Sequence, residues 1–443
     1  MGTKKTVGMI SLGCPKNQVD AELMLDKLAR AGFAISGDIG ECDAVIVNTC
    51  GFIEAAKVEA IETILEMADC KAAGEIKNLI VTGCLSERYR EDIRRELPEV
   101  DAVVGIGRNA DIVQIVDEAL GGELVEAFAD KELLPLTGGR ILTTPDYWAY
   151  LKIGDGCSNN CAFCAIPAIR GTFRSRTIED IVDEAKTLAS RGVKELVLIS
   201  QDTSLYGRDL YQKDRLPDLL TALSEVDGIR WIRFLYTYPE RITDELLDAM
   251  AASPKVCHYL DIPLQHADGT ILRAMHRPGD RATFEALIRH IRERVPDIVL
   301  RTTVMTGFPG ETDEQFEELA EFVRDMEFDN LGCFAFSPEE GTAAEAMEDQ
   351  VDEDVRAHRR DLILQLQHDI VRENQKKFLG KTLQVLVDAY NTIDDTYIGR
   401  FYGQAPEIDG TVLFKSPRAL HPGEFVEVSI LGADEYDLTG KAF

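Results

Sequence analysis

Short apolar runs that alternate with amphipathic helical segments constrain the fold of this chain more than any other feature. Over residues 1–121 the apolar runs are TVGMISL, DAVIVNT, NLIVTG and VDAVVGI, separated by helical patterns such as NQVDAELMLDKLARAG. Strands that alternate with helices form βαβ units, and the strands of such units lie parallel in one sheet. The first 121 residues therefore predict an α/β domain built on a parallel sheet.

Three of these predicted strands end on a cysteine. Cys14, Cys50 and Cys84 follow SLG, VNT and VTG, so the spacings are about one βα unit each. Successive parallel strands end at the same edge of a sheet, with neighbours about 4.8 Å apart. Ligands bind just beyond that edge in open α/β sheets. The three thiols should therefore converge on a cluster site; three buried cysteines placed by coincidence are the alternative.

A second alternation predicts a barrel over residues 146–374. Its candidate strands are WAYLKIG, ELVLISQ, WIRFLYT, VCHYLDIP, IVLRTTVMTG and LGCFAFS. Six β-then-α units favour a partial (β/α)6 barrel, with ligands gathered on the loops at the carboxyl ends of its strands. Residues 122–145 lose the periodicity and gain Gly and Pro, which predicts a linker. Residues 375–443 carry short β runs between turn residues, which predicts a small OB-like β-barrel.

The loop after the first predicted barrel strand carries the strongest local motif, CSNNCAFC, with Cys157, Cys161 and Cys164. Cysteine thiolates are the standard ligands of iron–sulfur clusters. A structural zinc site would need a fourth Cys or His nearby, and AIPAIRGTFRSR supplies none. Three thiolates leave one iron of a four-iron cluster without a protein ligand. We therefore predict a [4Fe-4S] cluster with an open coordination site.

Composition limits the compartment and the partners. Ten cysteines without a secretory signal favour metal or redox roles over a disulfide framework. No apolar run approaches the ~20 residues that cross a bilayer, so we expect a cytoplasmic protein without membrane association. The formal net charge of −30 disfavours nucleic acid and favours a basic partner. Residues 311–355 are the most acidic stretch, with 17 acidic residues and one basic residue.

CSNNCAFC resembles the cluster motif of the radical S-adenosylmethionine (SAM) superfamily. With a three-cysteine sheet domain before the barrel and a small β-barrel after it, the whole chain resembles the methylthiotransferases. That family combines a cluster domain, a radical SAM core and a TRAM domain. SLGCPKNQVDAE is similar to the branch that modifies an aspartate of ribosomal protein uS12, and LDIPLQH and TGFPGET are also similar to family segments.

The resemblance implies that the protein adds a methylthio group to the β-carbon of an aspartate in uS12 by a reaction with two SAM molecules. One SAM would methylate a sulfur on a [4Fe-4S] cluster held by the first three cysteines. The other, at the CSNNCAFC cluster, would give the radical that removes hydrogen from the β-carbon. The expected SAM contacts are Phe163, Gln201, Asp202, Gln265 and Arg301. Because the cofactors supply the chemistry, we nominate no acid–base catalytic residue.

The expected partners are uS12, free or on the ribosome, and an electron donor. The main alternative is a tRNA adenosine methylthiotransferase, because small OB-like barrels often bind RNA. A tRNA enzyme should carry a basic groove, whereas residues 375–443 hold about ten acidic and seven basic residues. We therefore expect no direct nucleic-acid substrate. A non-catalytic electron carrier is a further alternative, but carriers usually give each cluster four protein ligands.

The sequence alone leaves the roles of two further groups of residues open. Arg170, Arg174 and Arg176 form a compact basic cluster that either binds carboxylates of SAM or substrate or is held in ion pairs. Three histidines, His258, His266 and His276, lack the i, i+4 spacing of a helical metal site, so we expect them to be structural.

Overall fold

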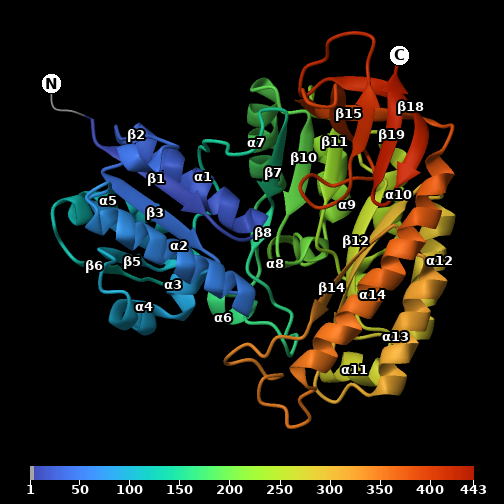
Figure 1. Cartoon of the computed structure of the whole chain (residues 1–443), viewed down its shortest axis with the longest axis horizontal. Helices are drawn as coiled ribbons and strands as arrows, with labels where there is room; N and C mark the ends of the chain where they lie inside the picture. The colour runs from blue at the N-terminus through green and yellow to red at the C-terminus, as the bar shows by residue number, and fades with distance from the viewer. Residues whose placement is uncertain (1–3) are drawn as a thin grey trace.

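The computed structural model describes residues 4–443 and begins with a six-stranded, wholly parallel sheet in the order β2-β1-β3-β4-β5-β6 (Figure 1). β3 and β4 are buried at every residue, as expected for strands covered by helices on both faces. The predicted parallel α/β domain is thus confirmed. Its strands are β1 (Thr6–Ser11), β2 (Ala34–Ile35), β3 (Ala44–Thr49), β4 (Asn78–Gly83), β5 (Ala102–Val104) and β6 (Val125–Ala127), and its helices are α1 (Pro15–Arg30), α2 (Glu54–Ala72), α3 (Cys84–Arg88), α4 (Arg90–Glu96) and α5 (Ile112–Leu120).

The linker predicted over residues 122–145 requires a correction. β6 lies inside this segment and pairs with β5 through Ala102 and Val125, so the sheet extends beyond residue 121. Arg140, also in this segment, is buried and donates to Glu22 of α1 and to Glu184. The Gly and Pro content of this segment predicted a linker. Its edge strand was missed because three residues are too few to leave a periodic signal.

The second part is the predicted partial barrel of six parallel strands. Its strands form two triplets, β11-β10-β7 and β12-β13-β14. A single parallel bridge between Ile232 and Val256 joins the triplets. The strands are β7 (Trp148–Lys152), β10 (Glu195–Ile199), β11 (Trp231–Phe234), β12 (Tyr259–Gln265), β13 (Val299–Thr306) and β14 (Asn330–Ala335). The helices are α6 (Ile166–Arg170), α7 (Ile178–Ser190), α8 (Arg208–Tyr211), α9 (Leu216–Ser224), α10 (Asp244–Ala252), α11 (Gly269–Ala274), α12 (Arg281–Arg294), α13 (Asp313–Met326) and α14 (Glu353–Asn374).

The third part is a closed five-stranded barrel in the order β15-β16-β17-β19-β18, which confirms the predicted OB-like fold. Its strands are β15 (Thr382–Asn391), β16 (Thr396–Phe401), β17 (Val412–Lys415), β18 (Phe425–Asp434) and β19 (Asp437–Ala442). Within residues 4–443, no helix is long and apolar enough to span a bilayer.

The C-terminal barrel packs on the amino-terminal end of the large barrel (Figure 1). Lys194, just before β10, donates to the Gly423 carbonyl at 2.6 Å, and Trp231, the first residue of β11, meets Phe425 edge-on with ring centroids 4.8 Å apart. The opposite, carboxyl end of the large barrel carries the cysteine loop and faces the N-terminal domain. That end is where ligands bind in barrels of this kind.

Candidate iron–sulfur and substrate site

The three cysteines of the N-terminal domain lie at one edge of its sheet. Cys14 immediately precedes α1, Cys50 follows β3, and Cys84 is the first residue of α3 after β4. Neighbouring strands are in register up to this edge, so their ends are aligned. Gly13 has a φ of +90°, and a Cβ there would lie 2.6 Å from the Cys50 Cβ. Only glycine lets the Cys14 loop approach Cys50 this closely.

The side chain of Asn17, in the first turn of α1, contacts all three cysteine-bearing segments. Its Nδ2 donates to the Leu12 carbonyl at 3.2 Å and to the Thr49 carbonyl at 2.8 Å. Its Oδ1 lies 3.5 Å from the Cys84 Sγ and accepts from it. A single buried amide therefore fixes the relative positions of the loops that carry the three thiols. We call Cys14, Cys50 and Cys84 the sheet-edge thiols.

The second set, Cys157, Cys161 and Cys164, sits on a loop that a two-stranded ribbon closes. β8 (Gly154–Asp155) pairs antiparallel with β9 (Arg174–Ser175) on either side of the loop. Gly156 has a φ of +78°, and a Cβ there would lie 2.1 Å from the Thr172 carbonyl oxygen, so glycine is required next to Cys157. We call these three residues the barrel-loop thiols.

Polar groups surround the barrel-loop thiols. Asn159 Nδ2 donates to the Cys157 Sγ at 3.5 Å, and the Tyr238 hydroxyl lies 3.5 Å from the Cys161 Sγ. Arg277, which is buried, donates to the same sulfur at 3.8 Å. Hydrogen bonds to sulfur are a main means by which proteins set the potential of iron–sulfur clusters.

The two sets of thiols lie on facing surfaces of the N-terminal domain and the barrel. Cys84 packs in one buried apolar cluster with Ala165 and Ile169, which follow Cys164 in the chain. The next residue, Arg170, donates to Asn17 Oδ1, the same atom that accepts from Cys84. The side chain that organises the sheet-edge thiols is thus bonded directly to the barrel-loop segment.

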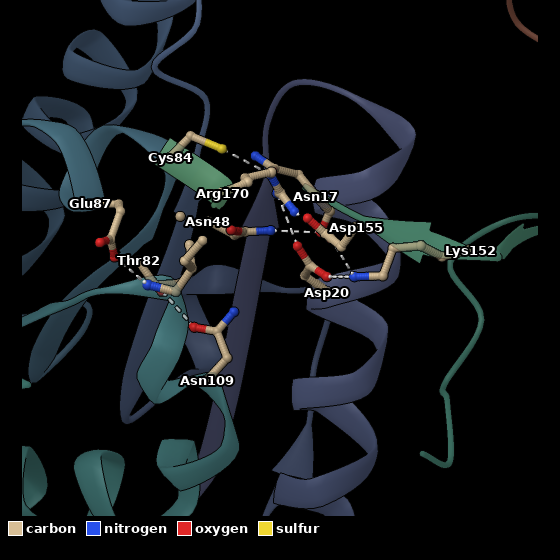
Figure 2. Close-up of polar contacts among 12 residues, drawn as sticks. Asn17, Asp20, Asn48, Thr82, Cys84, Glu87, Asn109, Lys152, Asp155 and Arg170 are labelled. Carbon is tan, nitrogen blue, oxygen red and sulfur yellow. Dashed lines mark hydrogen bonds and ion pairs between the residues drawn. The ribbon is translucent and has the colours of Figure 1, made fainter. Parts of the chain in front are cut away.

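A buried ionic network joins the two domains at this point (Figure 2). Arg170 donates to Asp155 Oδ2 at 2.8 Å and to Asp20 Oδ2 at 3.0 Å. Lys152, the last residue of β7, donates to Asp155 at 3.0 Å and also to Asp20. All four side chains are almost fully buried, and their two positive and two negative charges balance. We call these four residues the interdomain network.

The chemistry of both sets of thiols fits iron–sulfur clusters. Burial raises the pKa of Cys84 and of Cys164 to about 12, so these thiols stay protonated until a metal displaces the proton. Within residues 4–443, no three His, Cys, Asp or Glu side chains converge on a single metal ion. Cluster ligands each bind a different iron, and they therefore stand farther apart than the ligands of one ion. Each set offers three sulfurs, which suits a cubane.

The five expected SAM contacts differ in their surroundings in the structure. Phe163 is half-buried against the apolar cluster that includes Phe308, and Gln265 ends β12 with a φ of +72°. Gln201 donates to Asp155 at 3.3 Å, while its buried Oε1 has no hydrogen-bond partner among residues 4–443. These three side chains are placed at the carboxyl end of the barrel.

Asp202 and Arg301 have protein partners. Asp202 accepts from Asn159 at 2.8 Å and from Arg241 at 3.0 Å, and it caps a short 3-10 helix. Arg301 donates to Asp409 of the C-terminal barrel at 2.9 Å. Both side chains are thus held by protein contacts, and their contact with SAM stays a prediction.

Ion pairing accounts for most of the basic cluster that the sequence left open. Arg170 belongs to the interdomain network, and Arg176 pairs with Asp180 at 2.7 Å. Arg174 donates to the Glu132 carbonyl. The three histidines contact protein groups: His258 pairs with Asp297, His266 with Glu311 and His276 with the Asn160 carbonyl.

Sequence reasoning missed Asn17, Asp20, Lys152 and Asp155. A signal was present, because Lys152 stands in the otherwise apolar strand WAYLK and Asp155 lies two residues before Cys157. A charge in a buried strand needs a buried partner, but the sequence does not show which residue supplies it.

The comparisons with known proteins agree with this architecture. The chain matches the radical SAM superfamily over residues 151–323, the uncharacterized protein family UPF0004 over residues 6–105 and the TRAM domain over residues 379–443. Among solved structures it is similar to a radical SAM methyltransferase, TsrM from Kitasatospora setae, with cobalamin and a [4Fe-4S] cluster bound. That match has a TM-score of 0.54 and 15% identity, and covers 77% of each chain. Fold and cysteine loop together define a radical SAM enzyme, with SAM and [4Fe-4S] clusters as its cofactors.

Its sequence relatives are more specific. Ribosomal protein uS12 methylthiotransferases named RimO are 49% identical in Symbiobacterium thermophilum, over 100% of this chain and 92% of the relative, and 48% identical in Lachnoclostridium phytofermentans, over 98% and 99%. The relative from Clostridioides difficile is 47% identical over 98% of each chain. The chain therefore belongs to the family of ribosomal protein uS12 methylthiotransferases.

Proposed function

We propose that this protein adds a methylthio group to the β-carbon of an aspartate in ribosomal protein uS12. The observation that carries the proposal is the pair of three-cysteine sets on facing surfaces of two domains, joined through Arg170 and Asn17. A reaction that brings sulfur to an unactivated carbon needs a sulfur-bearing centre and a radical source close together. Two incomplete sets of cluster ligands at one interface meet that need, whereas an electron carrier does not require it.

The sheet-edge thiols would hold one [4Fe-4S] cluster and the barrel-loop thiols the other. When bound, the two clusters and SAM supply the sulfur and radical chemistry. The protein contributes position: Asn17 holds the loops of the sheet-edge thiols together, and the interdomain network fixes the two domains against each other. Phe163, Gln201 and Gln265 would bind SAM at the barrel mouth.

This assignment gives each of the three domains a separate role. A cluster domain of residues 1–121, extended by β6, would face the radical SAM core of residues 146–374. The TRAM domain of residues 375–443 packs at the end of the core remote from the thiols, so it would act on substrate away from the reacting centre. The acidic residues 311–355 would attract a basic ribosomal protein, free or on the ribosome. The protein would work in the cytoplasm with a separate electron donor.

Mass spectrometry after anaerobic reconstitution tests the proposal. Enzyme with SAM and a reductant is incubated with uS12 in one reaction and with tRNA in another. We expect one methylthio group in place of one hydrogen on a single uS12 aspartate and no change in the tRNA. Modified tRNA with unmodified uS12 would assign the chain to the RNA-modifying alternative.

A further inference from the structure

Lys16 is a buried cation without an acidic partner among residues 4–443, and it contacts the barrel from the helix that follows Cys14. Its residue is 7% exposed. Among residues 4–443, no carboxylate lies within ion-pair distance of its ammonium. Lys16 Nζ lies over the ring of Tyr236, 3.5 Å from the ring centroid. Burying an ammonium without a counter-charge is costly, and a cation–π contact offsets that cost only in part.

The position of Lys16 points to the reacting centre. It lies two residues after Cys14, in the first turn of α1, whose N-terminus faces the sheet-edge thiols. Tyr236, which it covers, follows β11 at the carboxyl end of the barrel and has a φ of +64°. Lys16 therefore reaches from the N-terminal domain across the mouth of the barrel.

An acidic side chain beside Tyr236, Asp261, is engaged elsewhere. Asp261 on β12 accepts from the Tyr236 backbone N–H at 2.9 Å, and its second oxygen lies 3.8 Å from Arg301. Burial chiefly raises the pKa of Asp261, which favours its neutral form. Asp261 thus contacts the Tyr236 backbone and Arg301 and, among residues 4–443, forms no ion pair with Lys16, so the positive charge at the mouth is available to an incoming anion.

We propose that Lys16 binds the side-chain carboxylate of the substrate aspartate. The inference rests on the proposed function, which takes an aspartate as the target. The carbon that receives sulfur is bonded directly to that carboxylate. A cation fixed two residues from Cys14 would therefore hold the β-carbon next to the sheet-edge thiols, where the sulfur would be delivered. Lys16 is thereby a specificity-determining residue that selects aspartate over asparagine.

SAM also carries a carboxylate, so it is a second candidate ligand for Lys16. The location favours the substrate: Lys16 belongs to the element that carries Cys14, whereas the expected SAM contacts Phe163, Gln201 and Gln265 all lie on the barrel. The test below separates the two sources.

A double-mutant cycle tests the proposal with the reconstituted enzyme. One change is Lys16→Met in the enzyme, and the other is aspartate to asparagine at the target position of uS12. Binding of fluorescently labelled uS12 is measured by anisotropy with S-adenosylhomocysteine present, so that no turnover is needed. Lys27→Met is the matched control, because Lys27 lies on the same helix and donates to the Ala110 carbonyl away from the thiols.

We expect each single change to weaken uS12 binding about tenfold or more, as for a charged hydrogen bond, and the double change to add little further. Lys27→Met should leave affinity unchanged, and all three enzymes should hold equal iron. Additive effects in the cycle would overturn the proposal. So would an unchanged aspartate-to-asparagine preference together with a raised KM for SAM, which would assign Lys16 to the SAM carboxylate. If the cycle shows coupling but uS12 is bound without being modified, the proposed function fails and the carboxylate site stands.

Discussion

The interdomain network makes a quantitative prediction about Arg170. The Arg170→Met variant removes a buried guanidinium that bonds Asp155 and Asp20. Among the described residues, the two buried carboxylates then keep Lys152 alone as a cation. Breaking a buried ion pair by removing one partner costs about 3–5 kcal/mol, because the remaining charge is uncompensated. With an m-value of about 3 kcal/mol/M, the urea midpoint should fall by about 1–1.7 M.

Far-UV circular dichroism of the anaerobically reconstituted protein in urea measures this midpoint, taken from the first transition, since a chain with three folded parts need not unfold in one step. The control is Arg95→Gln, which removes a guanidinium paired with Asp92 and Glu96 on the exposed surface. Exposed pairs contribute little, so its midpoint should stay near that of the wild type.

A further substitution tests whether an uncompensated buried charge causes the loss of stability. Adding Asp155→Asn to Arg170→Met removes one of the uncompensated charges, so it should restore part of the lost stability. The reasoning would be refuted if Arg170→Met shifted the midpoint no more than Arg95→Gln does. It would also be refuted if the double variant were less stable than Arg170→Met alone.

Three further substitutions test the site and the domain contacts. Gly13→Ala should abolish the cluster of the sheet-edge thiols, because its Cβ would meet Cys50 at 2.6 Å, and iron analysis should show about half the iron of the wild type; full iron would contradict this. Asn17→Ala should lose iron from the same cluster faster under a chelator, since the three loops lose their common amide; equal rates would show that Asn17 does not hold them. Asp409→Ala should cost about 1.5–3 kcal/mol by removing the carboxylate that bonds Arg301 at 2.9 Å. Limited proteolysis should then release the C-terminal barrel faster than in wild type, and an unchanged cleavage rate would rule out this contact as a stabilising one.

Much of the architecture could be predicted because burial leaves periodic traces. The strands AVIVNT and NLIVTG are buried throughout and mostly apolar, as expected for strands covered on both faces, and their alternation with helices predicted a parallel sheet. Convergence of Cys14, Cys50 and Cys84 followed from that order alone. By contrast, β6 has three residues, too few for a pattern, and so residues 122–145 were expected to be a linker.

The polar surroundings of the thiols could not be predicted, because they depend on contacts between domains. Asn17 and Arg170 are 153 residues apart and share one hydrogen bond. Asp202 and Arg301 were expected to contact SAM, and the sequence does not show that each is also bound by a residue from a distant segment, Arg241 and Asp409 respectively. The sequence shows which residue stands in which helix or strand. The residue that bonds to it is set by how distant segments pack in the folded protein.

The central claim is that two sets of three thiolates each bind a separate cluster. Iron and sulfide content with electron paramagnetic resonance, measured on the reconstituted Cys50→Ala and Cys161→Ala variants, tests it most directly. The account predicts about eight irons in the wild type and about four in each variant, with a different signal lost in each. It would be contradicted if both variants lost the same signal, or if Cys50→Ala kept the full complement of iron.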